Sequence, residues 1–176
     1  MLVPLQGIIH ADIPEFVLYA ISHFSCRDKD VETFLKNKAF DFERRDKSRT
    51  YLIFDDANNI LLGYFTLSLK ALPFNENVSK NTIKNIDGFS NDIQSVGVIL
   101  IGQFGKDLVT AKDIEGKILF DICIETVYMA HKIIGGRFVL LECRDIEKIV
   151  LFYKRNGFQS LQYDENDKYL QMVRRL

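Results

Sequence analysis

The sequence has no tryptophan, only three prolines and only three cysteines among its 176 residues. Cys26, Cys123 and Cys143 are scattered and form no C-x-x-C pair, which argues against a disulfide framework and against a zinc site. The three histidines show no metal-ligand spacing, so we predict no bound metal. Sparse cysteines of this kind are typical of a reducing compartment, and we expect the cytoplasm.

Other absences narrow the class of protein further. The N-terminus lacks a basic stretch followed by an apolar one, so no signal peptide is predicted. No apolar run reaches the roughly 18 residues that span a bilayer, so we expect no membrane partner. The net charge is only −1, which gives no general attraction to nucleic acid. Hydrophobic residues make up 47% of the chain, enough for a substantial core, and the length fits a single domain over residues 1–176.

The first half of the chain predicts two helices followed by a β-hairpin. The hydrophobic patterns cover Asp12–Phe24, a stretch from Asp28 that bends or continues to about Asp46, and two strands at Arg49–Phe54 and Ile60–Leu69. Asp12 is the candidate cap of the first helix, with Pro14 in its first turn.

The second half predicts alternating strands and helices after a polar excursion. The segments are Leu72–Gln94 with one short helix at Val78–Lys84, a buried strand at Val96–Ile101, a helix at Asp113–Ile134, a strand at Phe138–Leu141, a helix from Asp145 to Arg155, and strands at Gln159–Tyr163 and Tyr169–Val173. Asp145 is the candidate cap of its helix. The buried stripe of the long helix is predicted to contain Leu119, Ile122, Thr126, Met129 and Ile133.

This order predicts an α/β fold, or α+β if the hairpins dominate. The strand–helix–strand crossover favours a parallel strand pair at the centre of the sheet. Ligands in such sheets bind beyond the carboxyl ends of the strands, which places Gly102–Glu115 and Glu142–Asp145 around one cleft. Backbone amides at the start of the helix predicted from Asp113 can hold a phosphate or pyrophosphate there.

Three segments match recognised sequence patterns. Ile99–Asp107 is similar to the strand pattern V-L-L-G-R-L-A-V-D, Gly116 falls where the last glycine of Q/R-x-x-G-x-G/A falls, and Phe152–Phe158 is similar to F-Y-x-x-x-G-F. Through these segments the sequence resembles the Gcn5-related N-acetyltransferase (GNAT) family over nearly its whole length, and Ile99–Asp107 resembles that family's central strand. A weaker match, Phe24-Ser25-Cys26 followed by Phe34-Leu35, is similar to a bacterial subgroup that includes acetyltransferase toxins.

The resemblance implies a mixed, mostly antiparallel sheet whose central parallel strands splay at a cofactor cleft, flanked by helices. It also implies an acetyl-CoA-dependent N-acetyltransferase that lets a primary amine attack the thioester directly. Tyr153 matches the tyrosine that protonates the departing coenzyme A thiolate, and Glu142, at the end of its strand, is the candidate base. The residues implied to bind the cofactor are Phe104, Gly105 and Lys106 at the pantetheine arm, Lys112, Asp113, Ile114, Glu115, Gly116 and Lys117 at the pyrophosphate, and Asn156.

The sequence also departs from the family pattern. Ala111–Gly116 matches Q-G-x-G-x-G only in its last glycine, and the missing glycines normally let backbone amides approach the pyrophosphate. This departure favours an alternative, a GNAT-fold binding or regulatory module that lost catalysis. Tyr153 and Cys143 are more often buried structural residues when taken alone. The basic cluster formed by Arg44, Arg45, Lys47 and Arg49 is either a solvated face or a contact for RNA or phosphate.

The acceptor is left open by the sequence. A small amine, a peptide N-terminus, a protein lysine and the amino group of an aminoacyl-tRNA are all candidates, the last because of the toxin-like opening. A homodimer is expected by analogy only.

Overall fold

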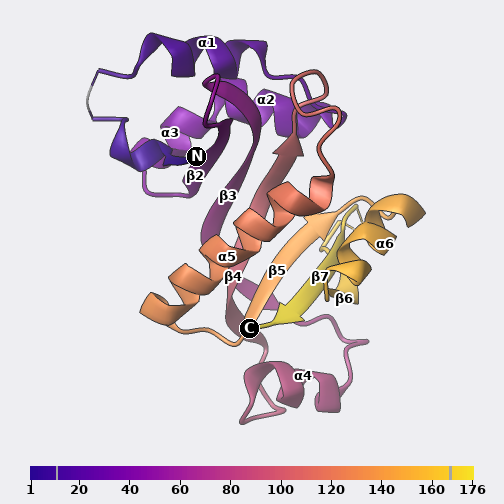
Figure 1. The fold of residues 1–176 in the computed structure, drawn as a ribbon. Coiled ribbons are helices and arrows are strands. Elements are labelled where there is room, and N and C mark those ends of the chain that lie inside the picture. The colour runs from indigo at the N-terminus through magenta and orange to yellow at the C-terminus, as the bar shows by residue number, and fades with distance from the viewer. Residues whose placement is uncertain (11, 167) are drawn as a thin grey trace. The chain divides into compact units, whose positions relative to one another are not determined.

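The computed structural model describes residues 1–10, 12–166 and 168–176. The elements, shown in Figure 1, are β1 (Leu2–Pro4), the 3-10 helix η1 (Leu5–Gly7), α1 (Glu15–His23), α2 (Lys29–Asn37), α3 (Ala39–Arg44), β2 (Arg49–Asp55), β3 (Ile60–Pro73), α4 (Lys80–Asp87), β4 (Ser95–Lys106), α5 (Gly116–Ile134), β5 (Phe138–Cys143), α6 (Glu147–Arg155), β6 (Gln159–Tyr163) and β7 (Leu170–Arg175). None of the described helices is long and apolar enough to cross a membrane.

The strands form one seven-stranded sheet in the order β1-β2-β3-β4-β5-β7-β6. β4 and β5 pair in parallel, with Ile99–Ile101 opposite Val139–Leu141. The pairs β1–β2, β2–β3, β5–β7 and β6–β7 are antiparallel. The predicted fold class, a mostly antiparallel mixed sheet with a parallel pair at its centre, is therefore confirmed.

The chain divides into two units. The first contains Met1–Ser68 and Gly102–Glu125, and the second contains Leu69–Ile101 and Thr126–Leu176. The core of the first unit collects apolar side chains from η1, α1, the linker between α1 and α2, α2, α3, β2 and β3. They are Leu5, Val17, Ile21, Phe24, Cys26, Leu35, Ala39, Leu52, Phe54, Leu61 and Tyr64. The core of the second collects Leu72, Ile86, Val98, Phe138, Leu140 and Val173.

Helix boundaries in the first unit follow local chemistry. The prediction that Asp12 caps the first helix is wrong: α1 starts at Glu15, and Pro14 occupies the N-cap position without a side-chain hydrogen bond. Asp28 caps α2 by accepting a hydrogen bond from the Asp30 amide. The second helical stretch bends at Lys38, which separates α2 from α3.

Two predictions in the rest of the chain needed correction, the bounds of the short helix and the buried stripe of the long one. The short helix in the polar excursion is Lys80–Asp87 rather than Val78–Lys84, because the Ser79 hydroxyl accepts a hydrogen bond from the Thr82 amide and caps it. Of the predicted stripe on α5, Leu119 and Thr126 are buried, but Met129 and Ile133 are exposed. Phe120, Cys123 and Val127 are buried instead, so the buried face is rotated relative to the prediction.

Candidate active site

The last residues of β4 form the first part of the predicted cofactor site. Gly105 is buried, and a Cβ atom at this position would lie 2.8 Å from Val31 Cγ1. A Cβ atom at Gly63 on β3 would lie 2.6 Å from the carbonyl oxygen of Gly105. Phe104 packs its ring edge-on against Phe120 of α5, with 5.0 Å between centroids. Gly63 is thus required by close backbone approach, and Gly105 faces tightly packed side chains. These contacts fix the strand that the resemblance assigns to the pantetheine arm.

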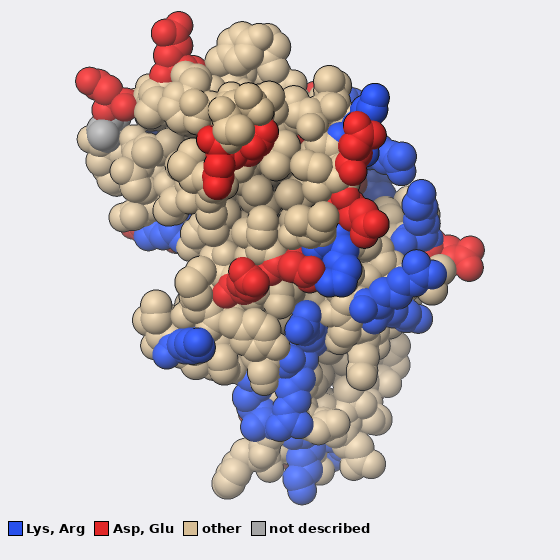
Figure 2. Space-filling model, viewed as in Figure 1, with Lys and Arg blue, Asp and Glu red and all other residues tan. Residues whose placement is uncertain are grey.

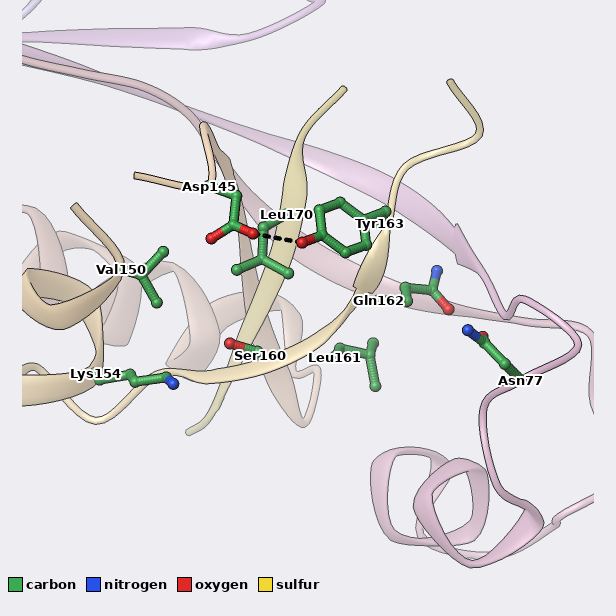
Figure 3. Close-up of a pocket in the computed structure, with 9 residues that line it drawn as sticks. All are labelled: Asn77, Asp145, Val150, Lys154, Ser160, Leu161, Gln162, Tyr163 and Leu170. Carbon is green, nitrogen blue, oxygen red and sulfur yellow. Dashed lines mark hydrogen bonds between the residues drawn. The ribbon is translucent and has the colours of Figure 1, made fainter. Parts of the chain in front are cut away.

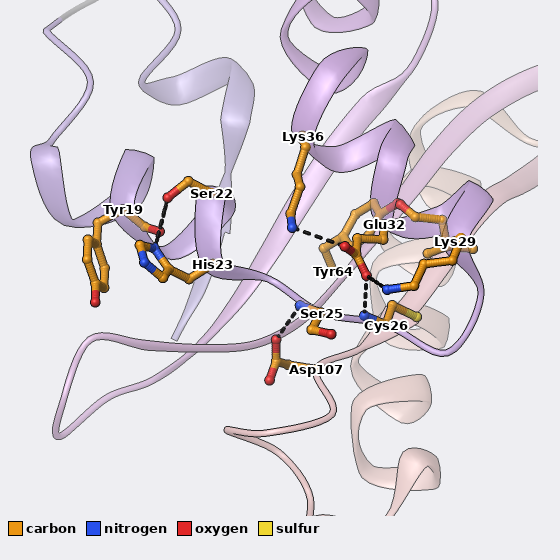
Figure 4. A network of polar contacts seen from close by, with 11 residues as sticks. Tyr19, Ser22, His23, Ser25, Cys26, Lys29, Glu32, Lys36, Tyr64 and Asp107 are labelled. Carbon is orange, nitrogen blue, oxygen red and sulfur yellow. Dashed lines mark hydrogen bonds and ion pairs between the residues drawn. The ribbon is translucent and has the colours of Figure 1, made fainter.

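A buried aspartate anchors the chain directly after β4. Asp107 is 3% exposed, and its Oδ1 atom accepts hydrogen bonds from the amides of Val109 and Thr110, both at 2.8 Å. Its Oδ2 atom accepts one at 2.9 Å from the amide of Ser25, in the linker between α1 and α2 (Figure 4). The Thr110 hydroxyl donates to the carbonyl oxygen of Leu61 at 2.5 Å. Hydrogen bonds to a carboxylate are stronger than neutral ones, so Asp107 holds the start of the loop firmly.

The loop between β4 and α5 is closed by the ammonium group of Lys106. Its Nζ atom donates to the carbonyl oxygen of Ile114 at 2.5 Å and to that of Lys112 at 3.4 Å. The Ile114 amide turns inward and donates to Ala111 at 3.0 Å. Within the part of the chain that the structure describes, no hydrogen bond uses the amides of Asp113 or Glu115. The loop therefore presents unpaired N–H groups despite its lack of glycine.

The predicted start of the long helix at Asp113 is wrong, because α5 begins at Gly116. Lys112–Glu115 consequently lie in the loop, and Gly116 and Lys117 form the first turn. The amides of these two residues have no hydrogen-bond partner among the described residues either. The Lys117 ammonium is paired with Asp121 at 2.6 Å, so its charge is offset on the helix itself. Open amides at the start of a 19-residue helix contribute partial positive charge here.

The predicted catalytic tyrosine lies on α6, in the second unit. Tyr153 is half-buried, and its ring packs edge-on against Phe152 and Phe158, with centroids 5.2 and 6.1 Å away. Asn156 is the C-cap residue, and its Nδ2 atom donates to the Phe152 carbonyl oxygen at 2.8 Å. Gly157 follows with φ +84° and ends the helix, as the sequence predicted. The segment thus fixes the position of Tyr153 within this unit.

The candidate base Glu142 lies on β5 in the same unit as Tyr153. Its Oε1 atom accepts hydrogen bonds from Lys70 Nζ at 2.6 Å and from Gln171 Nε2 at 2.7 Å. The side chain is 26% exposed, and its Oε2 atom has no hydrogen bond to any residue that the structure describes. One oxygen is therefore anchored, while the other can still accept a proton.

Gln171 extends this contact into a chain of amides across β7 and β6. Its Oε1 atom accepts a hydrogen bond from Gln162 Nε2 at 2.7 Å, and Gln162 Nε2 also donates to the Pro73 carbonyl oxygen at 2.8 Å. The Asn75 amide donates to Gln162 Oε1 at 2.9 Å. Strand register explains the contacts, because Gln171 is the partner of Glu142 across β5–β7 and of Gln162 across β6–β7.

The second unit also contains a cavity of about 400 Å³ (Figure 3). This is within the usual size range for small-molecule sites. Polar and apolar side chains line it together: Asn77, Asp145, Val150, Lys154, Ser160, Leu161, Gln162, Tyr163 and Leu170. The Asp145 carboxylate accepts a hydrogen bond from the Tyr163 hydroxyl. Asp145 therefore lines this cavity instead of capping α6 as predicted, and Ile146 occupies the N-cap position.

Lys and Arg side chains gather over α6 on the face shown in Figure 2. Lys148, Lys154 and Arg155 on this helix are exposed. The helix also carries an exposed acidic residue, Glu147, in its first turn. The basic cluster predicted near residue 45 behaves differently: Arg49 pairs with Glu43 and Asp46, and Arg45 pairs with Asp41.

The cysteines and the described acidic and histidine residues give no sign of other chemistry. All three cysteines are buried and unpaired, and burial raises the pKa of the Cys143 thiol to about 11. Cys143 Sγ lies 3.8 Å from the sulfur of Met172, which confirms that it is a buried core residue. The described residues contain no group of three or more His, Cys, Asp or Glu that could hold a metal ion.

Sequence reasoning missed the residues that hold the site in place. The sequence prediction includes Asp107 only as the last residue of the strand motif Ile99–Asp107, yet an aspartate that can bind the amides two and three residues after it is a recognised turn pattern. Lys70 and Gln171 left no local signal, because their contacts join strands far apart in the chain.

No protein-family model and no curated protein matches the sequence. Solved structures match over almost the whole chain. A bacterial toxin has a TM-score of 0.74 at 17% identity and covers 99% of this chain and 90% of its own. AtaT complexed with acetyl-methionyl-tRNAfMet has a TM-score of 0.69 at 22% identity, and the match covers 97% of this chain and 92% of AtaT. A tyrosine-to-phenylalanine mutant of KacT has a TM-score of 0.69 at 26% identity, and the match covers 97% of this chain and 93% of KacT.

The chain has the GNAT fold. AtaT and KacT are GNAT-fold acetyltransferase toxins, and AtaT has also been solved with acetyl-CoA and with the C-terminus of the antitoxin AtaR. The resemblance drawn from the strand before Asp107 and from Phe152–Phe158 is thereby confirmed at the level of fold. Of the site residues that the GNAT resemblance implies, the first unit contains the pantetheine and pyrophosphate segments, and the second contains Glu142, Tyr153 and Asn156.

Proposed function

We propose that this protein is an acetyl-CoA-dependent N-acetyltransferase. The observation that carries the proposal is the set of unpaired amides between Lys106 and the start of α5, at the segment that the GNAT resemblance assigns to the pyrophosphate. Backbone N–H groups at a helix start suit a phosphate irrespective of side-chain identity. The AtaT structures solved with acetyl-CoA support the same co-substrate.

In the proposed reaction, the neutral acceptor amine attacks the thioester carbonyl carbon, and the carbon–sulfur bond then breaks. Glu142 takes a proton from the acceptor nitrogen through its unpaired Oε2 atom. Tyr153 gives its hydroxyl proton to the departing thiolate. Phe104, Gly105 and Lys106 contribute backbone groups to the pantetheine arm. Within Lys112–Lys117, the amides other than that of Ile114 hold the pyrophosphate, since the Ile114 amide donates to Ala111. Asn156 supports the cofactor from the C-terminal end of α6.

The first experiment is ligand binding. Acetyl-CoA and coenzyme A at millimolar concentration are expected to raise the melting temperature, because a ligand that binds only the folded chain stabilises it. NAD and ATP serve as controls and are expected to have no such effect. An unchanged melting temperature with both coenzyme A forms would overturn the proposal.

Replacement of Tyr153 by phenylalanine tests the proposed acid. General acid catalysis contributes about 10²–10⁴-fold, so kcat is expected to fall by at least about 100-fold, while acetyl-CoA affinity stays within about twofold. The phenylalanine keeps the ring contacts to Phe152 and Phe158. A stopped assay for acetylated product measures kcat, and calorimetry measures affinity. A variant with wild-type kcat would leave Tyr153 as a packing residue only.

The acceptor that we propose is the amino group of an aminoacyl-tRNA. AtaT has been solved with acetyl-methionyl-tRNAfMet, and the exposed Lys148, Lys154 and Arg155 on α6 supply charge that suits a phosphate backbone. A panel of charged tRNAs, a peptide N-terminus, a protein lysine and a small amine, each with labelled acetyl-CoA, tests the choice. Faster turnover of the small amine or peptides than of every charged tRNA would contradict it.

The glycine-poor loop motivates the alternative of an inactive binding module, which predicts the fold without turnover on any acceptor of the panel.

The complexes of AtaT with AtaR suggest an antitoxin-like protein partner for this chain, and a homodimer stays an expectation by analogy. Light scattering of the purified chain measures the oligomeric state directly.

A further inference from the structure

The loop between β4 and α5 lacks the glycines that normally expose its amides, yet the amides of Asp113 and Glu115 have no hydrogen-bond partner among the described residues. Ala111–Glu115 contains no glycine, and only Gly116 matches the family motif. A backbone that presents several N–H groups on one side must be held in that conformation by something else. The side chain that contacts this backbone is Lys106, through the carbonyl oxygens of Lys112 and Ile114.

The two contacts of Lys106 also determine the direction in which the neighbouring amides point. In a planar trans peptide, the C=O of one residue and the N–H of the next point in opposite directions. The Lys112 and Ile114 carbonyl groups both point to the Lys106 ammonium, so the amides of Asp113 and Glu115 point away from it. Both amides have no hydrogen-bond partner among the described residues, whereas the Ile114 amide between them is used within the turn.

We propose that Lys106 is a positioning residue that replaces the missing glycines by holding the amides of Asp113 and Glu115 outward, toward the pyrophosphate. The inference rests on the proposed function. Lys106 occupies the place of a valine in the V-L-L-G-R-L-A-V-D pattern, so a lysine here is a feature of this chain and not of that pattern. Lys106 acts through the backbone: its ammonium is partly buried and directed at carbonyl oxygens.

Two ligands separate this role from a general effect on folding. Coenzyme A contains the pyrophosphate, and acetylpantetheine contains the same thioester arm without it. In Lys106→Met, we expect the Kd for coenzyme A to rise by about tenfold, the equivalent of one charge-assisted hydrogen bond. The Kd for acetylpantetheine is expected to stay within about twofold. Lys106→Arg is expected to recover most of the affinity, and Lys106→Gln provides a second neutral variant if the methionine variant does not fold.

Lys38→Met is the charge-matched control. Lys38 is exposed at the junction of α2 and α3 and belongs to no part of the proposed site. Raising NaCl to about 0.5 M screens a direct ionic contact between an exposed ammonium and phosphate, but it does not remove a backbone-positioning effect. The ratio of the coenzyme A affinities of wild type and Lys106→Met is therefore expected to persist at high salt.

The outcomes are distinct. Selective weakening of coenzyme A binding that persists at high salt supports the inference. Equal weakening of both ligands, no weakening, or a loss that disappears at high salt overturns it and leaves the proposed function intact. Failure of the wild-type chain to bind coenzyme A overturns the proposed function itself, and the inference falls with it.

Discussion

Two polar regions of this molecule satisfy their hydrogen bonds in opposite ways. In the first unit, Asp107 and Lys106 use their charges to fix a loop whose outward amides are left without partners. In the second unit, Lys70, Glu142, Gln171 and Gln162 donate to and accept from one another and nearby backbone. What this second region leaves open is an acceptor, Glu142 Oε2.

The difference teaches which ligand chemistry each region suits. Open backbone donors next to a helix start suit an anion such as a phosphate. A carboxylate whose other oxygen is held by hydrogen bonds can accept a proton on its unpaired oxygen. In neither region is an anchoring side-chain atom among the buried polar atoms without a hydrogen-bond partner in the described residues.

Asp107→Asn gives the largest expected effect and breaks the first region at its anchor. An amide side chain cannot accept hydrogen bonds on both sides, so at least the bond from the Ser25 amide is lost inside a buried site. The free energy of unfolding is expected to fall by about 3 kcal/mol, measured by urea denaturation. Coenzyme A affinity is expected to fall with it.

Asp113→Asn is the matched control for this stability measurement. Asp113 is exposed on the same loop, and its carboxylate makes no hydrogen bond to a described residue. A stability change within about 0.5 kcal/mol is expected for it. Equal losses in the two variants would show that the buried anchor is not what holds the loop.

Glu142→Gln tests whether the second region has a catalytic role in addition to its structural one. The amide oxygen can still accept from Lys70 and Gln171, so we expect a stability loss of only about 1 kcal/mol. As the proposed base, however, Glu142 is expected to contribute about 100-fold to kcat, with acetyl-CoA affinity unchanged. Glu147→Gln, exposed in the first turn of α6, is the control. Wild-type kcat in Glu142→Gln would restrict this residue to the hydrogen-bonded network.

Glu32→Gln has the smallest expected effect and concerns a partly buried counterpart of Asp107, since the Glu32 side chain is 16% exposed. Asp107 holds Ser25, and Glu32 Oε2 accepts from the next amide, that of Cys26, at 3.0 Å (Figure 4). Hydrogen bonds from Lys29, the Cys26 amide and Lys36 lower the pKa of Glu32 from 4.5 to about 2.

A folded-state pKa below the ordinary value means that the ionised form of Glu32 stabilises the fold. This contribution is complete above about pH 4.5 and is lost as the pH falls toward 2. Wild type is therefore expected to be more stable than Glu32→Gln at pH 6, and the difference is expected to shrink during acid titration followed by circular dichroism. A difference that stays constant down to pH 2 would contradict the assignment.

The sequence by itself determined the order of the elements and the fold. Hydrophobic periodicity placed most helices and strands, and the segment Phe152–Phe158 together with Ile99–Asp107 was specific enough to indicate the GNAT fold. These features are local, because a helical period, a capping residue and a helix-ending glycine each act within a few residues.

Only the tertiary structure decided how the predicted site residues are held. The contacts of the Lys106 ammonium run to two carbonyl oxygens up to eight residues away. Glu142 is paired with Lys70, which is 72 residues distant in sequence. Met129 and Ile133 fit the helical stripe but are exposed, because the direction of the buried face depends on what packs against the helix. Such contacts depend on which strands become neighbours, and no local pattern encodes that.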